Sequence, residues 1–448
     1  MRVRRRRFYA GTLAVALLFL SGCAFGPLAV ETNRLRYNEA LRQTGNEEFL
    51  LNMVRLRYRD IPEFDTVTNI LSSHEFDAGL NPREELRRRG TGSPIANTNI
   101  FDLLVLGGST AISERPTITF SPLQGPDFTQ HLLGPIHLES IVLLASTGWD
   151  LDLILRVAVQ EMNHIPNVRE LVTVPEAPPC FEEFAGVAQQ MRDLKRQGCL
   201  ELSFEDFQKP LTDPWEHSGP ITTSDMLSAA DRGYDFHKYG DKSLVLWGKE
   251  RHPVLRIAPG AWTASPEAAQ VAQELHLTPG ILTYRLISGQ EHGQFQPSAT
   301  PGAELVVSTR SVIGLLILAS KAVEVPAKHV EAGLVSLPVD SQGHPFDWTC
   351  LTRDLIRIHS QKSKPRHAYV AAKYRGYWFY IDDDDLPSKT TFGLMYEVFG
   401  LELAGGVVPG PVVTVPVGGG LQVSPGGGGG GAGAGGRRGG GGGGGGGG

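Results

Sequence analysis

The chain has 448 residues and a formal net charge of −6, from 42 lysines and arginines against 48 aspartates and glutamates. This acidic balance argues against a general nucleic-acid binder, which needs a basic face, and the length suits two or three domains. Glycine is concentrated at one end, because 25 of the 54 glycines lie between residues 405 and 448. The body before that region has the composition of an ordinary globular protein.

The first 23 residues have the pattern of a secretory signal. Five arginines among the first seven residues precede an apolar run of 11 residues, from Ala10 to Leu20. A membrane-spanning helix needs roughly 20 residues, so this run is too short to be one. Leu20-Ser21-Gly22-Cys23 resembles the lipobox of bacterial lipoprotein precursors. The resemblance implies that the chain is cut before Cys23, that the thiol carries a diacylglyceryl group and that the freed amine is acylated.

This resemblance also predicts a location. Ala24, and not an aspartate, follows the cysteine. By resemblance to the lipoprotein sorting rule, this favours the outer membrane of a Gram-negative cell, and we expect the body to face the periplasm. Two or three acyl chains anchor a protein firmly, where one chain binds only marginally. Arg5-Arg6-Arg7-Phe8 also resembles a twin-arginine signal, so both export routes stay open. Without residues 1–22 the chain has 426 residues and a net charge of −11.

The first half of the chain predicts helices with a few strands. Thr44-Gly45-Asn46 interrupts the helical pattern, and Glu47 and Glu48 suit the first turn of a new helix. The arginine-rich segment 81–99 has the composition of a loop. Asp150 suits a helix N-cap. The predicted elements are helices 31–43 and 47–59, strand 64–71, strands 100–106 and 116–120 joined across Gly107-Gly108-Ser109, helices 125–133, 135–145, 151–162 and 180–197, and strand 199–204.

The proline-rich segment 208–220 predicts a domain boundary. Beyond it, Thr223-Ser224-Asp225 suits the cap of a short helix, and Pro266 suits the first position of a later one. The apolar segment 311–323 predicts a helix that is too short, at 13 residues, to span a bilayer. The other predicted elements are strands 243–247 and 253–257, helix 265–275, and strands 281–287 and 304–309.

A β-hairpin is predicted near the C-terminus, with strands Ala368–Tyr374 and Tyr377–Ile381. Across a two-residue turn, position 374 faces 377, 372 faces 379 and 370 faces 381. Lys373 then lies opposite Trp378, as a cation–π pair requires.

A helix is expected to follow this hairpin from near Pro387. Its apolar residues recur at the spacing that packs a helix back on the sheet. They are Phe392, Met395, Tyr396 and Phe399. Residues 404–448, rich first in valine and proline and then in glycine, are expected to be disordered.

Three cysteines remain besides Cys23. Cys180 and Cys199 flank a predicted helix, and they either form a disulfide in an oxidising periplasm or stay two packed thiols. Cys350 is then left over. No cysteine and histidine spacing suggests zinc, so neither a metal nor a cofactor is expected.

Two charged clusters are candidate sites. Asp382–Asp385 lacks the alternating spacing of a calcium loop and is interpreted as a solvated loop that caps the next helix. A basic cluster before the hairpin is either a site for phosphate, an anionic glycan or a lipid head group, or a solvated loop near those aspartates. Its residues are Arg357, His359, Lys362, Lys364, Arg366 and His367. No catalytic residue is assigned, because no Ser-His-Asp, HExxH or paired-carboxylate signature occurs, although distant loops can assemble a triad.

Several segments resemble a family of uncharacterised Gram-negative envelope lipoproteins. They are Tyr37–Ala40 (YNEA), Leu50–Asp60 (LLNMVRLRYRD), Thr117–Gly125 (TITFSPLQG), Lys373–Asp382 (KYRGYWFYID) and Ser388–Phe392 (SKTTF). The arginine-rich segment 81–99 and the glycine tail depart from the family. The resemblance implies an envelope lipoprotein and carries over no activity.

We predict an α+β fold of mainly antiparallel sheets packed by helices, with a C-terminal hairpin-plus-helix module. The predicted function is that of a lipid-anchored envelope protein with a non-enzymatic role, which contacts the membrane and envelope proteins but not nucleic acid. The alternatives are a hydrolase whose deep pocket gathers a serine or carboxylate with a histidine, and a binding module for an anionic ligand. The predicted regions are signal 1–22, lipidated cysteine and helical tether 23–77, arginine-rich loop 78–99, α+β domains 100–207 and 221–403, and tail 404–448.

Overall fold

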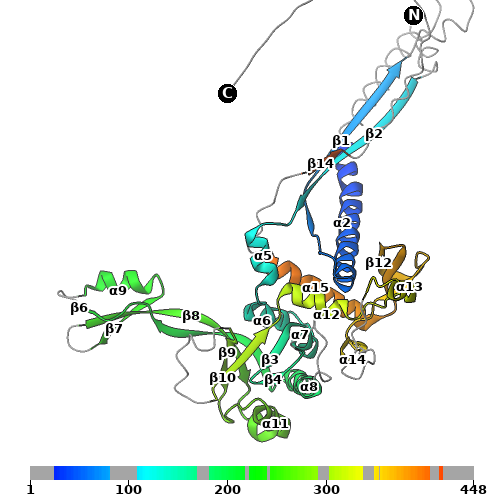
Figure 1. The fold of residues 1–448 in the computed structure, drawn as a ribbon. Helices are drawn as coiled ribbons and strands as arrows, with labels where there is room; N and C mark the ends of the chain where they lie inside the picture. The colour runs from blue at the N-terminus through cyan, green and yellow to red at the C-terminus, as the bar shows by residue number, and fades with distance from the viewer. Residues whose placement is uncertain are drawn as a thin grey trace, which may run out of the picture. The chain divides into compact units, whose positions relative to one another are not determined.

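The structure is a computed structural model that describes residues 25–80, 108–168, 181–216, 221–239, 243–290, 302–335, 348–352, 354–403 and 413–416 (Figure 1). Its helices and mainly antiparallel sheets confirm the predicted α+β fold. The chain divides into two compact units, the first with residues 1–67 and 121–412 and the second with residues 68–120 and 413–448. The division therefore differs from the predicted one, since both sides of the 208–220 segment belong to the first unit.

The second unit contains a three-stranded sheet in the order β1–β2–β14. β14 pairs antiparallel with β2, with Val413 opposite Phe120. The expectation that residues 404–448 form no structure is wrong for this strand, whose valines favour extended backbone. The predicted loop 81–99 and strand 100–106 lie outside the described residues. The strand bounds are β1 Asp65–Leu80, β2 Gly108–Pro122 and β14 Val413–Pro416.

The described part of the first unit begins with one long helix, α2, from Phe25 to Arg57. The predicted break at residues 44–46 is wrong. The Thr44 hydroxyl donates to carbonyls of the preceding turn, at 2.9 and 3.2 Å, and the helix continues through this position. A Cβ added to Gly45 would lie 2.8 Å from the Tyr396 hydroxyl. The glycine therefore permits a close contact inside a continuous helix and does not make a turn.

The last turns of α2 lie in the core of the first unit. Leu50, Met53 and Val54 have no exposed surface. The Phe49 ring packs edge-on against three rings of helix α15 (Leu386–Leu403), with ring centres 5.3 to 5.4 Å apart. The three partners are Phe392, Tyr396 and Phe399. The N-terminal and C-terminal helices of this unit therefore share one aromatic core.

The central sheet of the first unit has the strand order β4–β3–β10–β9–β8–β5, and β6 and β7 also pair with β8. Its described ladders are antiparallel apart from that between β9 and β10. Helix α7 ends at Ala158 rather than at 162, because the Arg310 N–H beside β10 binds the Ala158 carbonyl (2.7 Å) and draws the chain into the sheet. The bounds are β3 Val159–Met162, β4 Ile165–Pro166, β5 Leu200–Pro210, β8 Ser243–Ile257, β9 Thr283–Ser288 and β10 Glu304–Thr309.

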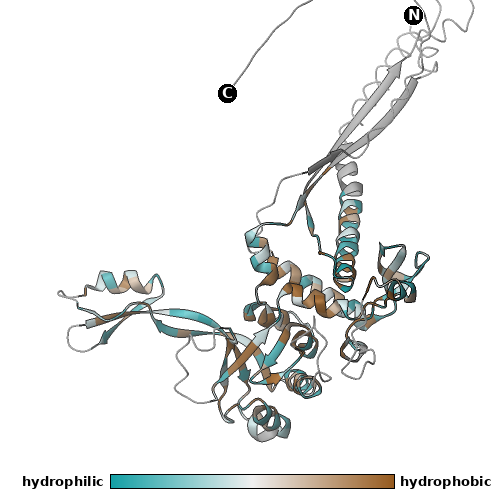
Figure 2. Cartoon of the chain, in the orientation of Figure 1, coloured by the Kyte–Doolittle hydropathy of each residue, from teal (hydrophilic) through white to brown (hydrophobic). Residues whose placement is uncertain are grey.

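Helices cover this sheet, and α12 is the most apolar of them (Figure 2). It packs against α2, α5, α7 and α15. The N-cap expected at Asp150 forms, and Ser265 and Ser311 also cap helices, because each of these side chains accepts a backbone N–H of the first turn. Within the described ranges, no helix has both the length and the apolar character needed to cross a membrane. The bounds are α5 Pro126–Leu133, α6 Leu138–Ser146, α7 Leu151–Ala158, α8 Glu182–Arg196, α10 Ala261–Ala264, α11 Pro266–Glu274, α12 Val312–Ser320, α13 Ala327–Glu331 and α14 Thr349–Thr352.

β8 continues past the sheet into an arm. The two short strands expected near 243–247 and 253–257 form one strand, because β5 pairs with it residue by residue from Leu200 to Pro210. Residues 208–216 of the predicted boundary segment therefore lie within the arm. Helix α9 is capped by Thr222 and Asp225 in a reciprocal capping box. The remaining arm elements are β6 Trp215–Glu216, α9 Thr223–Ala230 and β7 Tyr234–Tyr239.

The C-terminal module is a three-stranded sheet in the order β11–β13–β12. The predicted hairpin register is confirmed, with 374 opposite 377, 372 opposite 379 and 370 opposite 381. The face that carries these paired positions is buried at Val370, Ala372, Phe379 and Ile381. The strand bounds are β11 His359–Gln361, β12 Ala368–Tyr374 and β13 Tyr377–Asp382.

Cys199, at the start of β5, carries a free thiol. Its predicted partner, Cys180, lies outside the described residues. The alternative of packed, unpaired thiols therefore holds at Cys199, which is half-buried.

Removal of the Phe49 ring tests the shared aromatic core. We expect Phe49→Ala to lower the free energy of unfolding by about 3–5 kcal/mol, because the ring leaves a cavity among three aromatic neighbours. The matched control is Leu35→Ala on the same helix, where the side chain is 71% exposed and the expected change is within about 0.5 kcal/mol. Denaturant unfolding followed by circular dichroism measures both. Equal changes in the two variants would contradict the shared core.

Candidate functional site

The predicted basic cluster lies on the small sheet of the C-terminal module. Gln361 of β11 and Lys373 of β12 both lie opposite Trp378 of the central strand β13. Residues opposite one another on neighbouring strands share a face of the sheet. Lys364, in the loop between β11 and β12, places its Nζ 5.3 Å from the Trp378 ring centre. The cation on this ring is therefore Lys364 and not the predicted Lys373, and the two lysines flank the ring on one face.

The structure groups four of the six predicted residues and separates two. His359 faces carboxylates, with Nδ1 3.1 Å from Glu324 Oε1 and Nε2 3.7 Å from Asp382 Oδ2. Arg357 precedes β11, and its backbone N–H donates to the Ser388 hydroxyl (2.8 Å). The other four are exposed on the loop that joins β11 to β12. These four residues, Lys362, Lys364, Arg366 and His367, together with Lys373, are called the cationic surface below.

The aspartate run lies beside this loop, but the carboxylates of Asp383 and Asp385 bind residues of α15, and that of Asp382 faces His359. Asp383 Oδ1 is 2.7 Å from Lys389 Nζ. Asp385 accepts the Ser388 hydroxyl (2.5 Å) and backbone N–H (3.1 Å), which confirms the predicted helix cap. Among the described residues, no carboxylate lies within ion-pair distance of the cationic surface. The cationic surface therefore carries uncompensated positive charge.

Contacts from distant parts of the chain hold this module on α2. The Tyr374 hydroxyl donates to the Asp60 carboxylate, and Arg375 Nη2 lies 3.0 Å from the same Asp60 oxygen. The Tyr374 hydrogen bond, and then the Arg375 guanidinium, lower the pKa of Asp60. Tyr58 hydrogen-bonds His329 Nδ1 at 2.6 Å, and burial raises the pKa of Tyr58 to about 12. These groups position the sheet that carries the cationic surface.

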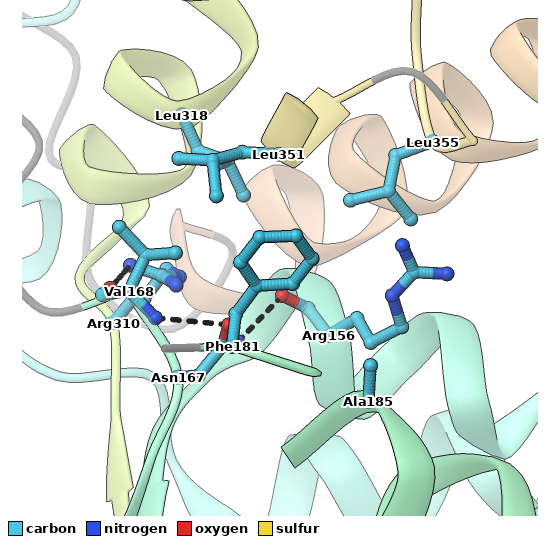
Figure 3. Close-up of a pocket in the computed structure, with 9 residues that line it drawn as sticks. All are labelled: Arg156, Asn167, Val168, Phe181, Ala185, Arg310, Leu318, Leu351 and Leu355. Atoms are coloured by element: carbon cyan, nitrogen blue, oxygen red, sulfur yellow. Dashed lines mark hydrogen bonds between the residues drawn. The ribbon is translucent and has the colours of Figure 1, made fainter. Parts of the chain in front are cut away.

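A small cavity borders α7, α8 and α12 near the end of β10, and Arg310 lines it (Figure 3). The Arg310 side chain is 1% exposed. Its Nε and Nη1 donate to the carbonyls of Val157 (3.1 Å) and Val168 (2.7 Å). Burial lowers the pKa of Arg310 to about 10, so the group stays charged at neutral pH. Nothing in the sequence marks this residue, because a lone arginine between a strand and a helix is typical of a surface position.

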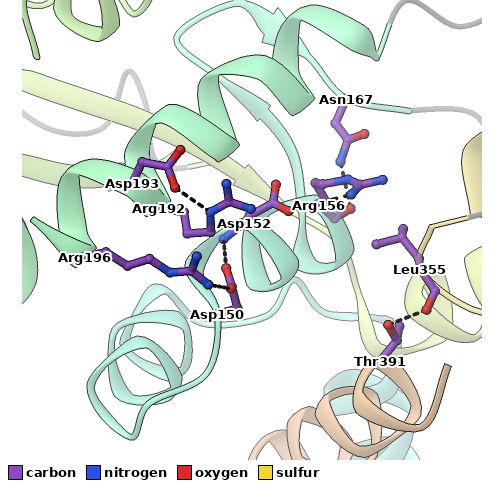
Figure 4. Close-up of polar contacts among 9 residues, drawn as sticks. All are labelled: Asp150, Asp152, Arg156, Asn167, Arg192, Asp193, Arg196, Leu355 and Thr391. Atoms are coloured by element: carbon purple, nitrogen blue, oxygen red, sulfur yellow. Dashed lines mark hydrogen bonds and ion pairs between the residues drawn. The ribbon is translucent and has the colours of Figure 1, made fainter. Parts of the chain in front are cut away.

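Charged side chains of α7 and α8 pair beside this cavity (Figure 4). Asp150, the cap of α7, accepts from Arg196 Nη2 at 2.6 Å. Asp152 Oδ2 lies 3.7 Å from Arg156 Nη1, and burial raises the pKa of Asp152. Asn167 donates from Nδ2 to the Arg156 carbonyl (2.9 Å). These contacts tie the two helices to the chain that leaves β4.

A second cavity, with a volume of about 250 Å³, lies where β8 separates from β9. His137 and Ser288 are among its lining residues. His137 Nδ1 lies 2.7 Å from Glu402 Oε2, and its backbone N–H donates to Glu402 Oε1 (3.2 Å). A carboxylate therefore orients the imidazole, as in hydrolase sites. The described structure shows no hydrogen bond from His137 to a serine or threonine hydroxyl, so it provides no paired nucleophile.

Lys321 follows α12 and lies close to the end of α2. Its Nζ is 4.8 Å from the Trp348 ring centre. Burial, and then the charges of Arg57 and Arg59, lower the pKa of Lys321 to about 8. This amine is therefore partly neutral in mildly alkaline solution.

Cys23, the predicted lipidation site, lies outside the described residues. Within those that are described, no three His, Cys, Asp or Glu side chains are grouped to hold a metal ion. The chain matches no family model, no curated protein and no solved structure. The function is therefore argued from the chain itself.

The low pKa of Lys321 predicts a rise in stability at alkaline pH. Between about pH 8 and the ordinary lysine pKa of 10.5, the unfolded chain keeps a proton that the folded chain has lost. Stability therefore increases with pH across this window. We expect Lys321→Met to abolish this increase, and Lys238→Met, at an exposed lysine of β7, to preserve it. Denaturant unfolding from pH 7 to 10.5 measures the slope, and an unchanged slope in Lys321→Met would contradict the assignment.

Proposed function

We propose that the chain is a lipid-anchored cell-envelope protein with a binding role. The observation that carries the proposal is helix α2, which begins two residues after Cys23 and ends inside the core. At 1.5 Å per residue, its 33 residues extend over about 50 Å. A lipid on Cys23 is then joined to the folded body through one continuous helix.

The exposed part of α2 suits a helical tether. Most side chains from residue 34 to 44 are exposed, so packing does not hold this part of the helix. Local pairs support it instead: Glu39 Oε1 lies 2.6 Å from Arg42 Nη2, and Gln43 donates to Glu47 (3.0 Å). Among the α2 side chains whose burial the structure describes, the buried ones lie in the last turns, where Phe49 meets α15. The helix therefore acts as a spacer that enters the body at one end.

The cationic surface supports an anionic molecule as the bound partner. It combines five residues that are cationic or become so on protonation with an aromatic ring, Trp378, and its lysines and arginine have no carboxylate partner among the described residues. Such a surface favours phosphate or carboxylate groups, and its attraction is screened by salt. A hydrolase is the weaker alternative, because His137 has an orienting carboxylate but no paired hydroxyl in the described structure.

Metabolic labelling tests the anchor. We expect the full-length protein to incorporate a palmitate analogue and to fractionate with the outer membrane. Cys23→Ala is expected to lose the label, because the acylated thiol is removed. Cys199→Ala, at a free thiol within the body, is the matched control and should retain it. A Cys23→Ala protein that stays labelled or embedded would show that the first 22 residues anchor the chain in another way.

Charge reversal tests the cationic surface. Immobilised heparin serves as an anionic glycan probe, and the salt concentration at elution is the measurement. We expect the Lys364→Glu/Arg366→Glu variant to lose retention, because two free cations become anions. Lys238→Glu, at an exposed lysine on β7, should elute like the wild type. Unchanged retention of the double variant would rule out this surface as the binding site.

A further inference from the structure

The cavity beside Arg310 has the features of a site for a small anion. Two of the three guanidinium nitrogens of Arg310 bind backbone carbonyls, at 3.1 Å from Nε and 2.7 Å from Nη1. The third, Nη2, is buried and has no hydrogen-bond partner among the described residues. A buried N–H without an acceptor costs about 1–3 kcal/mol, and more where the group is charged. An occupant that accepts from Nη2 would recover this energy.

The cavity also lacks a compensating negative charge. Its described lining contains two guanidinium groups, Arg310 and Arg156, and no carboxylate. Asp152 compensates Arg156 at 3.7 Å, whereas no acidic group of the described structure pairs with Arg310. The remaining wall is largely apolar, with Phe181, Leu318, Leu351 and Leu355. One positive charge is therefore held in a poorly solvated site, where an unpaired ion is costly.

The volume of the cavity limits which anions can bind in it. Its free volume is about 10 Å³, which corresponds to one water-sized particle. Phosphate and carboxylate groups are too large, since each carries several heavy atoms. A water molecule fits and can accept from Nη2, but it leaves the charge of Arg310 uncompensated. A monoatomic anion meets both requirements.

We propose that this cavity binds a single halide ion, chloride under physiological conditions, held by Arg310 Nη2 among the apolar side chains of the wall. The ion stabilises the junction of α7, α8, α12 and α14, because the residues around it come from these helices and from the end of β10. Halide binding is therefore linked to the stability of the first unit.

Thermal unfolding of the full-length, detergent-solubilised protein tests this site. Chloride is exchanged for gluconate, which is too large for the cavity, at constant ionic strength. We expect the unfolding midpoint to be higher in chloride by roughly 2–4 °C, and the difference to saturate as chloride increases. Crystals soaked in bromide should show an anomalous peak within hydrogen-bond distance of Arg310 Nη2.

Three variants separate halide binding from general effects of salt. Arg310→Met removes the donor, and Ala185→Leu fills the cavity from α8 while it leaves Arg310 in place, so both should lose the difference between chloride and gluconate. Arg192→Gln, at an arginine that pairs with Asp193 rather than lining the cavity, should keep it. If Arg310→Met fails to fold, the Ala185→Leu variant and the bromide peak still test whether the cavity binds a halide. Equal midpoints of the wild type in both salts, or a cavity that holds only water in bromide, would overturn the proposal.

Discussion

The contact between the first and the last helix of the first unit is the constraint on which the rest of this unit depends. The Phe49 ring of α2 lies among three rings of α15, and Tyr58, just beyond α2, packs edge-on against Tyr374 of the C-terminal module. Edge-on aromatic pairs contribute about 0.5–1.5 kcal/mol each beyond the burial of their area. Over 300 residues separate the partners in sequence, so this core cannot close until almost the whole chain is available. Helix α2 and the cationic surface are both positioned by it.

The features of the fold that follow from local rules could be predicted. The hairpin register, the cap at Asp150 and the cap formed by Asp385 depend on neighbouring residues, and the structure confirms them. Three of the failures involve distant partners. Gly45 is typical of a helix break until Tyr396 is placed beside it, and Pro253 is typical of a strand end until β5 pairs along the whole of β8. Helix α7 ends early because an N–H more than 150 residues away binds its last carbonyl.

The candidate site shows the same limit. A local run of basic residues identified the loop between β11 and β12. The carboxylates that pair with these residues, or fail to, could not be assigned from the sequence. Proximity to Asp382–Asp385 suggested a loop beside compensating acids, whereas those carboxylates cap α15 or pair with Lys389 and His359. No local sequence pattern identifies Arg310 or the buried Glu402. Arg310 donates to the carbonyls of residues 157 and 168, and Glu402 binds His137. Such groups become visible only when burial and hydrogen bonds are known.

The distribution of charge matters more than its sum for what this chain binds. Without residues 1–22 the chain has a net charge of −11, which disfavours an extended polyanion such as nucleic acid. Charges interact over about 8 Å at physiological ionic strength, so an anion at the cationic surface responds to Lys364, Lys373 and their neighbours and not to distant carboxylates. Lys364 lies over the Trp378 ring, so the charge and the aromatic ring meet in one contact, and Lys373 flanks the ring from the neighbouring strand. The ring therefore helps to hold the Lys364 ammonium group in place on the cationic surface.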